Sequence, residues 1–285
     1  MNSGLPCSLN RFAGQKGLPW WAILYLPFGL LLVLFRVLMA GIFALLAAAV
    51  PLPSWKNRIY KLTLLTSGLR VKKTGEVKNT GLPSVLVYNH VSLADALVIA
   101  SIENTTIIAA DPSANESSFN KHFFGAVIKS FDRHILIINN LRTLLRDIQE
   151  WKKSPSPRIL CVAPEGTIAD GRGLFRFEKF FFSFDTDVIP VALRVNPAFS
   201  FNIHPLGASH AVNMFWVFAM PYVTVEMDIM ETARRHDNET PSEFAERVRV
   251  SIANHVGAAP TEFSHADKVR GKFALKLYKL SSRKT

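Results

Sequence analysis

The stretch Ser84-Val-Leu-Val-Tyr-Asn-His-Val-Ser-Leu-Ala-Asp95 determines how the rest of the chain is interpreted. Its first five residues form a nearly continuous apolar run, which is typical of a strand buried on both faces in a parallel sheet. Asn89 and His90 follow where this strand should end, and open α/β sheets bind their ligands at that end. Asp95 lies at the start of a helical pattern, so a turn that folds back brings its carboxylate to one ring nitrogen of His90. The pair then predicts a histidine that accepts a proton on its other nitrogen.

A structural role competes with this interpretation. Ser92 and Asp95 have nearly the spacing of a capping box, so Asp95 can simply stabilise a helix N-terminus. A single histidine in a loop, such as His90, is more often a solvated polar residue than a base. On this stretch alone the catalytic interpretation is the less favoured of the two.

A second stretch, Arg158-Ile-Leu-Cys-Val-Ala-Pro-Glu-Gly-Thr167, repeats the arrangement. A strand-like apolar run breaks at Pro164, and Gly166 permits a backbone shape that most residues cannot adopt. Glu165 is therefore presented at a strand end, beside backbone N–H groups and Thr167. Such a turn can hold an anionic head group or a substrate hydroxyl. Each motif is weak alone, but the two in this order form a specific combination.

Together these residues resemble the glycerolipid (lysophospholipid) acyltransferase superfamily. His90 to Asp95 matches its HxxxxD box, Pro164 to Thr167 matches its substrate-binding box, and Val188 to Ala192 looks like the strand that closes its core. Within the superfamily the chain is most similar to the ancient ubiquitous protein subfamily of lipid droplets. The likeness covers roughly residues 20 to 270, and the segments that carry it are 89–91, 164–165, 170–177, 243–248 and 266–268.

The resemblance implies a fold and an activity. The fold is α/β, a mostly parallel sheet flanked by helices and preceded by an N-terminal membrane hairpin. The activity is transfer of a fatty acyl group from acyl-CoA to a hydroxyl of a lysophospholipid or glycerolipid, with His90 as general base oriented by Asp95. Acyl-CoA is a co-substrate, and no metal or other cofactor is implied. The residues expected to bind substrate are Asn89, Glu165, Gly166, Thr167, Arg172 and Arg176.

Two departures from the family pattern favour a second interpretation. The strand expected at His134 to Ile138 is followed by Asn139-Asn140, where relatives commonly carry a phosphate-binding arginine; the nearest basic residues are Arg133 and Arg142. Ile168 stands where a basic residue often follows the threonine. The alternative is a scaffold of the endoplasmic reticulum or lipid droplet whose acyltransferase domain is weak or inactive. Arg172 and Arg176 can supply a bidentate phosphate contact, or can be solvated loop charges.

Composition limits the remaining possibilities. The chain has 285 residues, of which 49% are hydrophobic and 19% charged, and its net charge of +11 favours an anionic partner such as phospholipid head groups. Its two cysteines, Cys7 and Cys161, give no disulfide framework. Walker A, GxSxG, HExxH and CxxC motifs are absent, and His204 and His210 lack metal-ligand spacing. Nucleic-acid binding is not expected.

Residues 20–53 are almost wholly apolar apart from Arg36. A single spanning helix would place Arg36 near the middle of the bilayer, and Pro27 and Gly29 interrupt the first half. A monotopic helical hairpin or re-entrant segment is therefore expected, with one or two true spans as the alternative. Basic residues on both flanks favour both ends in the cytosol, on the endoplasmic reticulum membrane or a lipid droplet.

The expected organisation has four parts. Residues 1–18 form a mobile polar leader, residues 19–54 the membrane hairpin, residues 55–258 the acyltransferase-like α/β domain, and residues 259–285 a basic tail. Residues 222–230 alternate apolar and polar, which predicts an edge strand with one wet face. Thr240 caps a helix that ends at Gly257. The ubiquitin-system modules of longer relatives have no room after the domain, so such partners are not expected.

Overall fold

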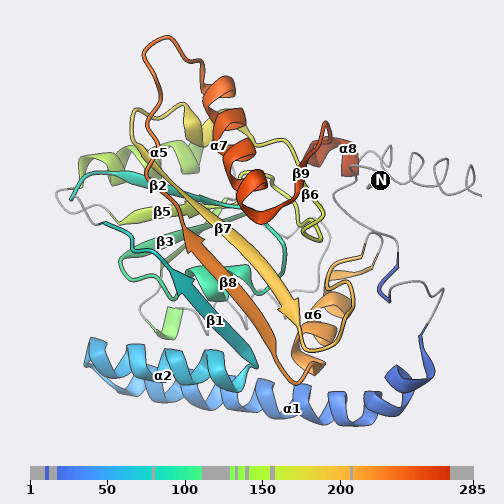
Figure 1. The fold of residues 1–285 in the computed structure, drawn as a ribbon. Coiled ribbons are helices and arrows are strands. Elements are labelled where there is room, and N and C mark those ends of the chain that lie inside the picture. The colour runs from blue at the N-terminus through green and yellow to red at the C-terminus, as the bar shows by residue number, and fades with distance from the viewer. Residues whose placement is uncertain are drawn as a thin grey trace, which may run out of the picture.

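The computed structural model describes residues 10–12, 18–78, 81–110, 129–131, 134–138, 141–154, 158–205 and 208–269 (Figure 1). Their central feature is a sheet of seven strands in the order β1-β8-β7-β2-β5-β3-β4. Neighbouring strands are parallel, except that β7 and β8 are antiparallel. The strands are β1 (Leu69–Thr74), β2 (Ser84–Tyr88), β3 (Thr105–Ala110), β4 (His134–Ile138), β5 (Ile159–Val162), β7 (Asp187–Pro197) and β8 (Val223–Ile229).

Helices cover both faces of this sheet (Figure 1). The side chains of β2 alternate between two apolar clusters, Val85 and Val87 in one and Leu86 and Tyr88 in the other, so both faces of the strand are buried. One cluster includes α5 (Leu141–Lys153) and α7 (Pro241–Val256), and the other includes α2 (Pro53–Thr66), α3 (Asp95–Ile99) and α6 (His210–Ala219). The predicted mostly parallel α/β fold is confirmed.

The strand predicted at an edge is not at an edge. β8 lies between β1 and β7 in the sheet. Its alternation was interpreted correctly, since Val223, Val225 and Met227 are buried and the residues between them are only partly buried. Alternation reports which face of a strand is covered and says nothing about how many neighbours the strand has. The parallel partner β1 comes from much earlier in the chain, and the local pattern does not reveal it.

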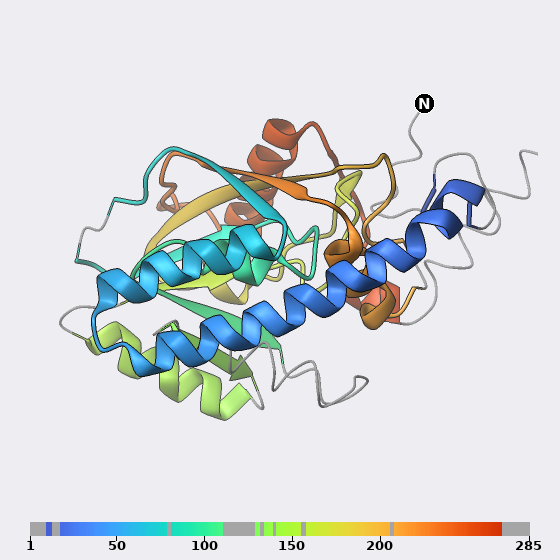
Figure 2. The same ribbon diagram turned by 90° about the horizontal axis from the view of Figure 1, so that it is seen from below.

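The N-terminal apolar segment forms one continuous helix, α1 (Trp20–Ala49). The expected break at Pro27 and Gly29 is therefore wrong. Proline removes one backbone donor, but the helix continues through it, and Gly29 is instead a packing point: a β-carbon there would lie 3.1 Å from Ala219 Cβ of α6. The chain does reverse, but it does so at residues 50–52, and α2 then returns along α1 (Figure 2).

Arg36, in the middle of α1, is buried against the body and does not face lipid. Its guanidinium donates to the carbonyl oxygens of Phe218 (2.7 Å), Met220 and Pro221 (2.7 Å), at the C-terminal end of α6, and to that of Thr66. Gly68 makes room for this guanidinium, because any β-carbon at position 68 would collide with it. Arg36, which was the reason to doubt a spanning helix, thus holds α1 against the domain with the helix axis along its surface.

The opposite face of α1 is apolar and exposed. By length and composition α1 is the one helix among the described residues that is apolar enough to cross a membrane. It is roughly 45 Å long and lies along the underside of the body (Figure 1). The large apolar side chains exposed on it are Trp20, Ile23, Leu24, Phe28, Leu30, Leu31, Leu34, Phe35, Val37, Leu38, Ile42, Leu45 and Leu46.

Both ends of the described chain pack on the body more than the sequence predicted. Phe12 is buried among Trp21, Phe201 and Trp216, so a mobile leader is wrong for residues 10–12. Ala259–Pro260 (β9) pairs with Gly173–Leu174 (β6), and α8 (His265–Val269) follows it. The rest of the expected basic tail lies outside the described residues.

Replacing Arg36 by methionine should weaken the attachment of α1. The substitution keeps an aliphatic chain but leaves four carbonyl oxygens without their donor, so we expect a loss on the order of 3 kcal/mol in the free energy of unfolding. The measurement is denaturant unfolding of the detergent-solubilised protein. Arg58→Met, at an exposed position of α2, is the matched control. Equal stability of the two variants would contradict the role assigned to Arg36.

Candidate active site

His90 lies two residues after the end of β2, at the carboxyl end of a central strand. Its Nδ1 lies 2.9 Å from Asp95 Oδ2, and its side chain is 24% exposed whereas that of Asp95 is fully buried. A carboxylate can only accept here, so Nδ1 carries the proton and Nε2 keeps a lone pair. The structure therefore brings together the two residues predicted as base and orienting acid.

Asp95 is held by the turn that it closes. Its Oδ2 also accepts hydrogen bonds from the backbone N–H groups of Val91 (2.7 Å) and Ser92 (2.9 Å). The same oxygen therefore closes the turn before α3 and orients the histidine. Three donors converge on that oxygen, which fixes the imidazole relative to the start of α3.

The two motif loops are bound directly to each other. The His90 backbone N–H donates to Glu165 Oε1 (2.7 Å), and the His90 carbonyl accepts from the Ala169 N–H (2.8 Å). The other oxygen of Glu165 accepts from the Phe175 N–H (2.8 Å). Glu165 was expected to bind substrate, but its side chain is fully buried and both oxygens have backbone partners. The structure places it as a positioning residue beneath the two loops.

Burial raises the pKa of Glu165 to about 8. The hydrogen bonds from His90 and Phe175 and the charge of Arg249 act in the opposite direction, and the charge of Asp95 adds to the increase. The effect of desolvation on the pKa is larger than that of the hydrogen bonds, because the carboxyl group is fully buried. Around neutral pH the residue therefore carries a proton more often than an exposed glutamate does.

Asn89 also has a structural position. Its side-chain amide donates to the Leu193 carbonyl (2.9 Å), and its side-chain oxygen accepts from the Leu193 N–H (2.7 Å). The amide is buried and extends the pairing of β2 with β7 by one step. The predicted substrate contact of Asn89 is replaced by this clamp.

The turn after β5 has the predicted shape. Gly166 has a φ of +63°, in the left-handed region, and is exposed. Thr167 accepts a hydrogen bond on Oγ1 from Lys268 Nζ (2.9 Å), which comes from α8. These two predicted residues thus lie together on the accessible side of the turn.

A cavity of about 550 Å³ opens beside these loops. Val91 lines it, as do Asp170 and Arg172, which follow the Pro164–Thr167 turn. Arg172 lies near Asp170 (Nε to Oδ2, 3.5 Å) and its side chain is 61% exposed, which leaves it able to reach a ligand. Arg194 and Arg11 also line the cavity, so its rim is basic. Arg176 is elsewhere and pairs with Glu262.

Two nearby residues were not predicted. His204 is buried, and its burial first, followed by electrostatic interactions with Lys268, His210, His90 and Arg11, lowers its pKa to about 2. The Asn213 side chain accepts from Arg11 through Oδ1, so its amide donates to His204 Nδ1 (3.0 Å). His204 is thus neutral beside His90 and Lys268. No spacing rule in the sequence connects these residues.

The remaining residues considered in the sequence analysis lie outside the described residues or away from the candidate site. Arg133, Asn139 and Asn140 lie outside the described residues, and Arg142 is exposed on α5. Among the described residues there is no group of three or more His, Cys, Asp or Glu side chains that could hold a metal ion. Cys161 is a free cysteine buried in β5.

Residues 70–194 match the family model described as Acyltransferase. The chain is 27% identical over 254 residues to a lipid droplet-regulating VLDL assembly factor AUP1 homolog of Caenorhabditis elegans, an alignment that covers 87% of this chain and 61% of that protein. The corresponding AUP1 of Danio rerio is 24% identical, with 86% of this chain and 56% of that protein covered. The chain thus spans about three fifths of the length of these relatives.

A solved structure supports the fold. The crystal structure of the 1-acyl-sn-glycerophosphate acyltransferase PlsC from Thermotoga maritima superposes with a TM-score of 0.55 at 17% identity, covering 80% of this chain and 96% of that one. The predicted resemblance to acyltransferases and to the lipid-droplet proteins is confirmed by the family model and the relatives, and the PlsC structure supports the fold.

Glu165 should give the protein a distinctive pH dependence. Its pKa in the folded protein, about 8, lies above its ordinary 4.5, so the folded state holds a proton that the unfolded state releases. The stabilising contribution is complete below pH 4.5 and is lost as the pH rises through 8, by up to about 1.4 kcal/mol per pH unit. Thermal unfolding of wild type and Glu165→Gln between pH 5 and 9 measures this difference. Glu231→Gln, at an exposed position, is the control, and identical pH slopes for wild type and Glu165→Gln would contradict the expectation.

Proposed function

We propose that this protein, whose residues 70–194 match the Acyltransferase family model, is an enzyme that acts at a membrane surface. It moves a fatty acyl group from acyl-CoA to a hydroxyl of a lysophospholipid or glycerolipid. The observation that carries the proposal is the hydrogen bond from His90 Nδ1 to a buried Asp95 carboxylate, made at the end of a central strand. This bond orients a partly exposed imidazole whose other nitrogen is basic.

The chemistry needs one base and one proton. His90 Nε2 takes the proton of the acceptor hydroxyl while its oxygen attacks the thioester carbonyl. The tetrahedral intermediate then collapses, the carbon–sulfur bond breaks, and CoA leaves as a thiolate that recovers the proton from the imidazolium. The negative charge of Asp95 stabilises the imidazolium between these steps. Neither a metal ion nor a cofactor other than the acyl-CoA co-substrate enters this scheme.

The acceptor and the donor would meet beside the two bound loops. Thr167 and Gly166 lie on the accessible side of their turn, and Arg172 stands on the rim of the neighbouring cavity. A basic rim suits the phosphate groups of a lysophospholipid or of CoA. Glu165 and Asn89 contribute from below by keeping the loops in place, and not by touching substrate.

The proposed location is the surface of the endoplasmic reticulum or of a lipid droplet, with the domain on the cytosolic side. The exposed face of α1 is apolar along its length while the other face is fastened to the body. A helix held lengthwise in this way fits a monotopic, in-plane anchor better than a span. The names of the relatives point to lipid droplets, whose single leaflet excludes a polar domain on the far side.

One observation favours a second candidate, a lipid-droplet scaffold with a weak or inactive domain. Ile168 is buried where relatives often carry a basic residue, so the turn itself presents no cation to a phosphate. The next experiment separates the two candidates.

His90→Ala should abolish acyl transfer by the purified protein. Loss of a general base lowers the rate by about 10² to 10⁴-fold, measured with labelled acyl-CoA and a panel of lysolipids. His236→Ala, at an exposed position away from the site, should retain full activity. Equal incorporation by wild type and His90→Ala would rule out His90 as the base, and no transfer by wild type to any acceptor would favour the scaffold.

Charging the exposed face of α1 should release the protein from membranes. Leu31, Leu38 and Leu45 are 65%, 62% and 74% exposed and lie on one stripe of the helix. Replacing all three by glutamate removes their burial in lipid without touching the packed face, so liposome flotation should fall several-fold while the melting temperature in detergent stays the same. Leu145→Glu, on an exposed position of α5, is the control. Unchanged flotation would exclude this face as the anchor.

A further inference from the structure

A second cavity, which we call the groove, lies between α2 and β1. It has a volume of about 930 Å³, and its walls come from α2, from β1 and the residues that follow it, and from the loop before β3. Leu64 and Leu69 give it an apolar side, and Lys61, Arg70 and Lys73 line it as well. None of the described residues that line the groove belongs to the candidate active site. The groove therefore has no part in the proposed reaction.

The three basic residues of the groove are not matched by carboxylates. Arg70 stacks on the ring of Tyr222, with its central carbon 3.9 Å from the ring centre, and this contact orients the guanidinium without neutralising it. Lys61 and Lys73 are exposed. Among the described residues, no carboxylate forms an ion pair with any of the three. Glu103 lines the groove too, but it accepts from Asn57 (2.7 Å).

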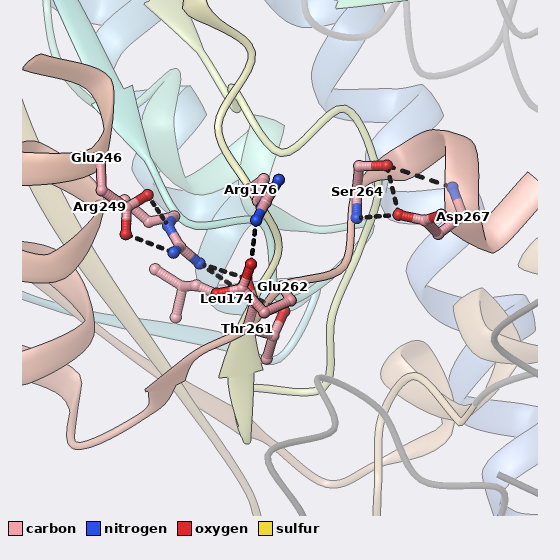
Figure 3. Close-up of polar contacts among 8 residues, drawn as sticks. All are labelled: Leu174, Arg176, Glu246, Arg249, Thr261, Glu262, Ser264 and Asp267. Atoms are coloured by element: carbon pink, nitrogen blue, oxygen red, sulfur yellow. Dashed lines mark hydrogen bonds and ion pairs between the residues drawn. The ribbon is translucent and has the colours of Figure 1, made fainter. Parts of the chain in front are cut away.

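Arginines elsewhere on the body do have carboxylate partners. Arg249 donates to both oxygens of Glu246 (2.6 and 2.8 Å), and Arg176 pairs with Glu262 (Figure 3). Residues 53–78 differ, because they contain seven lysine and arginine residues and one glutamate. This short stretch thus carries more than half of the chain's net charge of +11, and the groove lies within an electropositive surface.

A purely structural role explains only part of this charge. β1 is an edge strand, and lysine on an edge strand discourages pairing with another chain. That role accounts for Lys72 and Lys73. It accounts neither for Lys61, which is on α2, nor for an apolar cavity beside these cations.

The groove opens beside the surface proposed to face lipid. α2 lies next to α1 along the underside of the body (Figure 2). Trp55, Leu62 and Leu65 are exposed on one stripe of α2, and Leu65 also lines the groove. Lys61 lies one helical turn before Leu65, so a cation and an apolar side chain are neighbours at the mouth of the groove. An anionic headgroup held there would keep its acyl chains against the apolar stripes of α2 and α1.

We propose that the groove binds the headgroup of an anionic phospholipid of the membrane, with Lys61, Arg70 and Lys73 around its phosphate and Leu65 beside the start of its acyl chains. The lipid is a component of the membrane surface and not a substrate. The assignment rests on the location given under the proposed function and does not depend on acyl transfer. It adds an electrostatic contribution, selective for anionic surfaces, to the apolar contribution of α1.

The experiment measures vesicle binding by the full chain and by the variant Lys61→Gln/Arg70→Gln/Lys73→Gln. The vesicles contain phosphatidylcholine alone or phosphatidylcholine with phosphatidylserine, and flotation at varied lipid concentration gives the apparent affinity. The variant should bind the anionic vesicles on the order of a hundredfold more weakly than wild type, because each cation near an anionic surface contributes about fivefold. On neutral vesicles the two proteins should bind equally, and their melting temperatures in detergent should agree.

A matched control removes the same charge elsewhere. Arg142→Gln/Lys153→Gln/Lys179→Gln changes exposed positions of elements that cover the other face of the sheet, and this variant should bind anionic vesicles as wild type does. An equal loss in the control would show that net charge alone matters and would overturn the groove as a site.

Two further outcomes are distinguishable. Equal binding of wild type to neutral and anionic vesicles would overturn the lipid assignment and leave an acidic protein segment as the occupant to test. Failure of wild type to bind neutral vesicles, with binding to anionic vesicles that the groove variant loses, would contradict the anchor assigned to α1 and support the lipid site. The two assignments can therefore fail separately.

Discussion

The carboxyl group of Glu165 is the interaction on which the candidate site depends. It sits fully buried between two loops and accepts the backbone N–H groups of His90 and Phe175. Without it these two N–H groups would lose their partner, and the His90 loop would lose its attachment to the Pro164–Thr167 turn. Burial of this carboxyl group raises its pKa. The same burial and the two hydrogen bonds hold the two loops in fixed positions.

The local part of this arrangement was predictable. The continuous apolar run that ends at Asn89 predicted β2 with the bounds observed, because a strand covered on both faces must be apolar throughout. The His90–Asp95 contact was also predictable, since a five-residue separation leaves few ways for a turn to close. Thr240 and Gly257 mark the two ends of α7 through capping chemistry that sequence alone displays.

Contacts between distant residues were not predictable. The bond from His90 to Glu165 spans 75 positions and that from Lys268 to Thr167 spans 101, and neither leaves a periodic trace in the sequence. Arg36 shows the same limit: its charge was judged against a bilayer, whereas carbonyl groups at the end of α6, more than 180 positions away, are its partners. Residue type shows that a buried polar group needs a partner but does not show which one it has.

The attachment of α1 also relates the site to the membrane. Its N-terminal half packs next to residues that border the cavity. Phe12 contacts both Trp21 of α1 and Phe201, and Phe201 and Arg11 line the cavity. Tyr25 donates to the Ala219 carbonyl (2.6 Å), which keeps this end of the helix against α6. Since the outer face of the same helix is apolar, the cavity lies beside the part of the protein that would touch lipid. Under the proposed function, an acceptor with its acyl chain in the leaflet would therefore reach the cavity from the side of α1.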